Sequence, residues 1–140
     1  MTVGHKNKTF ATVLATLFGG AGAHRFYLFG KKDRLAWLYV LSWPLSAAAG
    51  FCIALAMHLK PSPLLLCPLS VFAGFIATLV IGLTPDQKWD ARHNPSSCRQ
   101  SNSGWAVILI VIATFFIGTT LLIAAIARAF DLLYTGGAYG

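Results

Sequence analysis

Few side chains in this sequence are placed to take part in chemistry. Asp86 and Asp90 stand four positions apart, so both lie on one side of any helix that contains them. Two carboxylates provide too few oxygen ligands for a divalent ion, and the neighbouring Lys88 and Arg92 favour a solvated face of mixed charge. His24 has no carboxylate or nucleophile beside it in the sequence. We therefore expect no catalytic residue, no metal site and no cofactor.

Known catalytic patterns are also missing from the sequence. It contains no GxSxG, HExxH or phosphate-loop motif, and its three cysteines show no CxxC or Cys–His spacing. The long apolar runs hold no acidic residue, although a coupled transporter normally needs an ionisable group within the membrane. His58, near the end of one run, is expected to be solvated or interfacial rather than a proton relay. We therefore expect neither an enzyme nor a pump.

The elements that carry these residues are expected to be membrane helices. Of the 140 residues, 56% are hydrophobic and 11% are charged, whereas soluble domains are about 25% charged. Three apolar runs, 35–59, 63–83 and 105–127, are long enough to cross a bilayer, which takes about 20 residues. A fourth run, 9–23, would span about 22 Å as a helix. Because period-2 alternation is absent, the pattern predicts an all-α polytopic protein with four transmembrane helices, the first one short.

The first run admits more than one interpretation. Its basic start and the sequence Ala21-Gly22-Ala23 resemble a secretory signal peptide, but the basic cluster that follows opposes translocation. If the run crosses the membrane, the loops divide the eleven basic residues seven against four; if it only dips in, the division is nine against two, which fits the positive-inside rule better. In both arrangements the richer side is cytoplasmic. Lys6 and Lys8 change sides between the crossing and the dipping arrangement, whereas Lys60 and Arg128 lie outside in both. The residues that are cytoplasmic in both arrangements are Arg25, Lys31, Lys32, Arg34, Lys88, Arg92 and Arg99.

Small residues recur every four positions on two of the runs, where they let helix backbones approach closely. These positions are Ser42, Ser46, Gly50 and Ala54 on the run 35–59, and Gly74, Thr78 and Gly82 on the run 63–83. The connection Lys60-Pro61-Ser62 is too short for anything but an antiparallel neighbour. We therefore expect these two helices to form a tight antiparallel hairpin.

The largest polar segment is the loop 84–104. Its first residues, Thr84-Pro85-Asp86-Gln87, predict a capping box that starts a short helix ending near Arg92. Trp89 on this helix is expected at headgroup level, and the residues from Asn94 onward are expected to be a flexible linker. The chain thus divides into a hairpin with its turn (1–59), a third transmembrane helix (60–83), a cytoplasmic loop (84–104), and a fourth helix with a disordered tail (105–140).

Residues 19–28, with the sequence GGAGAHRFYL, resemble the TM-two domain family of small membrane proteins, whose two helices are joined by a turn of the pattern GGxGAHRFYLG. The likeness extends from about Lys8 to Phe51 and implies two spanning helices with the turn in the cytoplasm. We follow this implication and expect the run 9–23 to cross the membrane, although the division of basic residues favours a dip. Two departures stand out. Phe29 is inserted before the glycine that ends the pattern, and an Asp common near the end of the family's second helix, a partner for the turn's Arg, has no counterpart before His58. The resemblance implies no activity.

The turn comprises Gly19, Gly20, Gly22, His24, Arg25, Phe26 and Tyr27. Its glycines permit a sharp bend and a close helix contact, and its aromatic rings suit the membrane interface. Arg25 can extend to the headgroups or to the carbonyl end of the first helix. The first interpretation is therefore an anchored turn, and the alternative is a surface that binds a partner or a lipid, with Arg25 on a phosphate group.

The sequence therefore predicts a small multi-pass protein of a bacterial cytoplasmic membrane with a structural or accessory role, acting through helix–helix and cytoplasmic-loop contacts. Its expected partners are the bilayer, including anionic headgroups, and either another membrane protein or further copies of itself. A nucleic acid is not expected, because the basic residues are scattered among short segments. Two other functions stay open: lipid binding, and an oligomeric pore lined by Ser42, Ser46, Thr114, Thr119 and Thr120.

Overall fold

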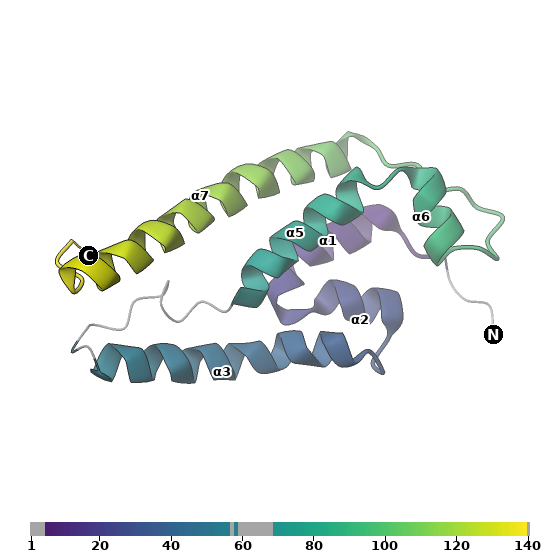
Figure 1. Ribbon diagram of the computed structural model, residues 1–140. Helices are drawn as coiled ribbons and strands as arrows, with labels where there is room; N and C mark the ends of the chain where they lie inside the picture. Colours follow the sequence, from purple (N-terminus) through teal and green to yellow (C-terminus); the bar gives the residue numbers. More distant parts are fainter. Residues whose placement is uncertain (1–4, 57, 59–68, 140) are drawn as a thin grey trace.

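The computed structural model describes residues 5–56, 58 and 69–139, and every regular element among them is helical (Figure 1). In chain order these are α1 (Lys8–Phe18), the short 3-10 helix η1 (Gly19–Ala21), α2 (Ala23–Phe29), α3 (Arg34–Ala56), α5 (Leu69–Leu83), α6 (Asp86–His93) and α7 (Trp105–Thr135). The expectation of an all-α protein is confirmed. The connection 60–62 and the start of the run 63–83 lie outside the described residues.

α1 and α2 form an antiparallel hairpin instead of one crossing helix. Asn7 starts α1, and its side-chain oxygen accepts a hydrogen bond from the Phe10 amide at 3.3 Å. The chain then reverses at Gly22, whose φ of 75° favours glycine. α2 returns beside α1 and brings the Tyr27 ring to 5.1 Å from the Phe10 ring, measured between centroids. The chain therefore runs one way along α1 and returns along α2, so that Phe29 lies at the same end of the molecule as the start of the run 9–23.

The described helices provide two or three candidate spans, so the expected four are not confirmed. α3 and α7 are each long and apolar enough to cross a membrane. α5 reaches that length only when α6 is counted with it, and the two helices meet at a bend of 108°. The runs 35–59 and 105–127 correspond to α3 and α7, although α7 continues to Thr135.

α5 packs against α1, η1 and α7, with α7 and α3 on opposite sides of it (Figure 1). Glycines make these contacts close: a Cβ added to Gly74 would lie 2.6 Å from the carbonyl carbon of Gly19, and one added to Gly82 would lie 2.2 Å from the Val111 side chain. Thr78 between them is fully buried. The small residues of α5 therefore face α1, η1 and α7. The expected tight hairpin requires them to face α3, but α1 and η1 occupy that side of α5.

α3 contacts the remaining helices mainly along its first half. The hydroxyl groups of Ser42 and Ser70 are hydrogen-bonded at 2.7 Å, and Trp43 Nε1 donates to the Gly20 carbonyl at 3.1 Å. The other three residues of the four-residue repeat on this helix, Ser46, Gly50 and Ala54, are half-buried or buried. These four residues thus lie on the most enclosed face of α3, while its large apolar side chains face outward.

Buried threonines from three helices meet in the interior. Thr12, Thr78 and Thr114 come from α1, α5 and α7, and Thr16 Oγ1 lies 3.4 Å from the hydroxyl groups of Thr78 and Thr114. Thr12 and Thr78 also donate to the carbonyl one turn earlier in their own helices. These hydrogen bonds satisfy the hydroxyl groups where little water is present. Thr114 therefore lies inside one molecule instead of on a free face.

The two ends of the molecule differ in charge. The return of α2 places the N-terminal segment at the same end as α6, where Lys8 contacts Asp86 at 2.9 Å. This arrangement agrees with the nine-against-two division of basic residues as far as the described residues go, with Arg128 near the far end of α7; Lys60 lies outside the described residues. There, Arg128 pairs with Asp131, and Asp131 Oδ1 accepts a hydrogen bond from the Tyr139 amide at 3.3 Å. The described part of the expected disordered tail is thus folded back on α7.

The contact between η1 and α5 gives the first prediction. We expect Gly74→Ala to lower the thermal midpoint of the purified protein in mild detergent, by the equivalent of about 1–3 kcal/mol, because the added methyl group meets backbone and not a movable side chain. Gly104→Ala is the matched control, since no atom lies within 4 Å of its added Cβ. Equal midpoints for the two variants would show that this contact is not tight.

Candidate functional site

The turn after η1 places His24 inside the molecule. Its exposed fraction is 4%, and its ring lies edge to face on Tyr39 with 5.7 Å between centroids. The buried Nδ1 has no hydrogen-bond partner among the residues that the structure describes. Burial, and then the charge of Arg25, lowers the pKa of His24 to about 4. His24 is therefore a neutral ring at pH 7, with one hydrogen-bonding atom unused.

Arg25 is held by a carboxylate and an aromatic ring. Its Nε donates to Asp33 Oδ2 at 2.8 Å, and its Cζ lies 5.1 Å from the centroid of the Phe29 ring. The hydrogen bond from Arg25 keeps the pKa of Asp33 below its usual value. Asp33 thus supplies the acidic partner that the resemblance left without a counterpart. Phe26 packs edge to face on Trp37 of α3, at 5.5 Å between centroids, so the turn is anchored on α3.

The three glycines of the turn lie at helix contacts. Gly19 and Gly20 face α5, and a Cβ added to Gly20 would lie 2.9 Å from the Val71 side chain. A Cβ added to Gly22 would lie 2.8 Å from the Cβ of Tyr39 in α3. These glycines therefore bring the turn against two other helices at once.

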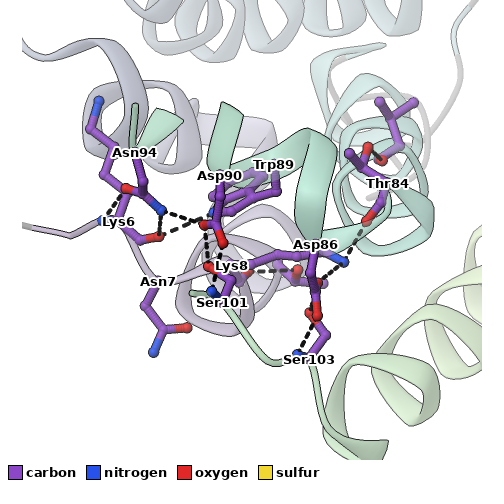
Figure 2. Close-up of polar contacts among 12 residues, drawn as sticks. Lys6, Asn7, Lys8, Thr84, Asp86, Trp89, Asp90, Asn94, Ser101 and Ser103 are labelled. Atoms are coloured by element: carbon purple, nitrogen blue, oxygen red, sulfur yellow. Dashed lines mark hydrogen bonds and ion pairs between the residues drawn. The ribbon is translucent and has the colours of Figure 1, made fainter. Parts of the chain in front are cut away.

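A second group of residues joins the N-terminal segment to α6 and to the loop before α7 (Figure 2). This polar cluster consists of Lys6, Lys8, Asp86, Trp89, Asp90, Asn94, Ser101 and Ser103. Lys8 is only 5% exposed, and its Nζ donates to the Thr84 carbonyl at 2.5 Å and to Asp86 Oδ1 at 2.9 Å. A buried ammonium group needs such partners, because removing it from water is costly.

Asp86 and Asp90 point into the polar cluster (Figure 2). The Ser103 amide donates to Asp86 at 2.7 Å, and the amide and hydroxyl of Ser101 each donate to Asp90 at 2.6 Å. The Ser101 bonds lower the pKa of Asp90 to about 2. Burial alone would raise the pKa of Asp86, but hydrogen bonds from Ser103 and Lys8 outweigh it and leave the pKa lowered. The two carboxylates are thus half-buried and hydrogen-bonded within the protein, whereas Lys88 and Arg92 of the expected solvated face are exposed.

Trp89 and Asn94 bind the backbone of Lys6. Trp89 is 2% exposed, and its Nε1 donates to the Lys6 carbonyl at 3.1 Å. The Asn94 side chain donates to the same carbonyl at 3.1 Å and accepts from the Lys6 amide at 2.7 Å. The ring of Trp89 is therefore enclosed by protein, and its expected position at headgroup level stays a prediction. The expected flexible linker is also tied down, at Asn94 and at the two serines of the polar cluster.

The start of α6 differs from the expected capping box. Pro85 is the residue before the helix, and no side chain caps it. Thr84 Oγ1 donates instead to the Val80 carbonyl at 2.5 Å, so the hydroxyl belongs to the last turn of α5. The Thr84 carbonyl is then free to accept the bond from Lys8.

A cleft of about 180 Å³ lies between α2, α5 and α6. His24 and Arg25 line it from α2, and Lys88, Arg92 and His93 line it from α6. The pKa of His93 is lowered by burial and then by nearby positive charge. The cleft thus brings the glycine-rich turn next to the loop helix, two features that the sequence places far apart.

Sequence reasoning missed Lys8, Asp33 and Asn94 as organising residues. A lone Asp inside a basic stretch is a usable signal for Asp33, because such a residue suits a pair with Arg25. Lys8 and Asn94 carry no local signal, since their partners lie 78 and 88 positions away. In the part of the chain that the structure describes, no three His, Cys or Asp side chains are grouped to hold a metal ion.

Residues 4–55 match the family model of the TM2 domain, the family that the turn resembles. The match takes in α1, η1, α2 and nearly all of α3, and the helices that follow lie beyond it. No curated protein and no solved structure matches the chain. Together with the long apolar helices, the match indicates a small membrane protein.

The polar cluster gives the second prediction. We expect Lys8→Met to lower the free energy of unfolding in detergent by about 2 kcal/mol, because Asp86 and the Thr84 carbonyl lose their shared donor. Lys32→Met removes the same charge from an exposed position and is expected to change stability by less than about 0.5 kcal/mol. A denaturation experiment that ranks the two variants equally would contradict the role given to Lys8.

Proposed function

We propose that this protein, which carries a TM2 domain at residues 4–55, is a structural or accessory protein of a bacterial cytoplasmic membrane. It acts by offering helix surfaces to a second copy or to another membrane protein. The basic end of the molecule, with the turn and the loop 84–104, faces the cytoplasm in this proposal. The excess of basic residues at that end supports the orientation.

The observation that carries the proposal is the second half of α7, which no other described helix covers. A helix of 31 residues is about 46 Å long, more than the roughly 30 Å of a hydrocarbon core. Contact with α5 reaches Gly118, which lies against Phe75. Beyond it, Ile123 is 62% exposed, and the small residues Ala124 and Ala127 are exposed beside it. Exposed small residues let another helix approach closely, which is how helices associate in lipid.

The described residues do not favour the oligomeric pore. Thr114 is buried, Ser42 is hydrogen-bonded to Ser70, and Thr120 Oγ1 donates to the Phe116 carbonyl of its own helix. These hydroxyl groups therefore form no continuous polar face on the part of the surface that is described. A helix-contact role needs no such face.

Orientation can be tested with Cys98, which is exposed in the loop before α7. In the variant C52S/C67S, Cys98 is the one remaining cysteine of the three. We expect a membrane-impermeant thiol reagent to label it only after the cells are permeabilised. Labelling of intact cells would place the basic end outside and contradict the proposed topology.

The helix-contact role can be tested by photo-crosslinking in native membranes. A photoreactive residue in place of Ile123 should give a discrete protein adduct, whereas the same residue in place of Val107, which is 2% exposed in the half of α7 beside α5, should give much less. Two differently tagged copies in one cell tell a second copy of the chain from another protein. Lipid adducts alone at both positions would count against the proposal.

A further inference from the structure

The cleft between α2, α5 and α6 has a basic side and an apolar side. The basic side is formed by Arg25, Lys88, Arg92 and His93. The apolar side is formed by Leu28, Ala77, Val80 and Ile81. A site with both kinds of wall suits a ligand that has an anionic head and a hydrocarbon chain.

The positive charge of the cleft is not balanced by its surroundings. Arg25 is paired with Asp33, but in the described chain no carboxylate forms an ion pair with Lys88 or Arg92. The two carboxylates of α6 are turned away from the cleft, into the polar cluster. The side chains of Lys88 and Arg92 are exposed and can therefore form charge-assisted hydrogen bonds with an incoming anion.

His24 adds an independent observation. It lines the cleft, is 4% exposed, and keeps a buried Nδ1 without a partner among the residues described. Buried polar atoms are nearly always hydrogen-bonded, so this unpaired atom in a residue that lines the cleft marks a position where a partner is missing among the described residues. A neutral imidazole has one N–H that can donate to an oxygen of a bound anion.

The position of the cleft indicates which class of anionic ligand it binds. It lies where the apolar α5 ends and the charged α6 begins, across the bend of 108°. At such a boundary a phospholipid places its phosphate group beside the basic residues and its chain along Val80 and Ala77. A soluble anion would use the basic side and leave the apolar side unfilled.

We propose that this cleft binds an anionic phospholipid, with Lys88 and Arg92 on its phosphate group and the side of α5 along its chain. The site deepens the proposed membrane function by naming a lipid class, and it rests on that proposal only for the placement of α6 at the membrane surface. It requires no protein partner.

The test uses the full-length protein in nanodiscs and measures how strongly phosphatidylglycerol is preferred over phosphatidylcholine, with spin-labelled lipids of each type. We expect K88Q/R92Q to reduce this preference about tenfold. The matched control K31Q/K32Q removes the same charge from exposed positions outside the cleft and should change it less than about twofold. Thermal midpoints measured beside the lipid data identify any variant that has lost its fold. R92K keeps the positive charge and should therefore retain most of the preference for phosphatidylglycerol. It provides a folded variant for the lipid measurement if K88Q/R92Q does not fold.

Two results would overturn the proposal. An equal loss of preference in K31Q/K32Q would mean that the whole basic end attracts anionic lipid without a specific site. Displacement of the spin-labelled lipid by soluble glycerol phosphate at matched concentration would show a site for a free anion. The lipid measurement and the Ile123 crosslink are read out separately, so failure of the lipid site leaves the helix-contact role standing, and the reverse also holds.

Discussion

The fold depends on the close approach of two backbones, at Gly19 in η1 and Gly74 in α5. Helices in lipid gain no hydrophobic energy by meeting, so they associate where small residues let their backbones touch. α1 and α2 are too short to be stable spans. α1 and η1 keep their place because they pack along this line of small residues on α5, and α2 packs in turn on α1 and α3. The buried threonines then join α1, α5 and α7 with hydroxyl groups that are themselves hydrogen-bonded.

The polar cluster completes this packing at the basic end. Lys8 and Asp86 neutralise each other, and the serines of the loop before α7 satisfy the remaining carboxylate oxygens. Because the acidic residues of α6 are used in this way, Lys88 and Arg92 form no ion pair with any of the residues described. One arrangement therefore explains two properties: the tied-down N-terminal segment, and the positive cleft between α2 and α6.

Properties that depend on local pattern could be predicted from the sequence, and those that depend on distant partners could not. Hydropathy identified the helices α3 and α7, and the residues after Thr84 indicated α6. The environment of Trp89 could not be predicted, because its partner is the carbonyl of Lys6, 83 positions away. For the first run, two signals disagreed: the resemblance favoured a full crossing, whereas the division of basic residues favoured a return. The structure agrees with the charges, since a return lets Lys6 and Lys8 lie at the end that carries α6.

The same long-range contacts set an order for assembly during synthesis. The residues that hold Lys6 and Lys8 are made some 80 positions later in the chain, which at about 5–20 residues per second is a delay of several seconds. The α1–α2 hairpin is therefore synthesised before the helices that it contacts. During that interval Lys8 has no partner at the membrane surface. The hairpin reaches its final position only when α5 and α6 arrive, so the N-terminal part of this chain is made first and docks late.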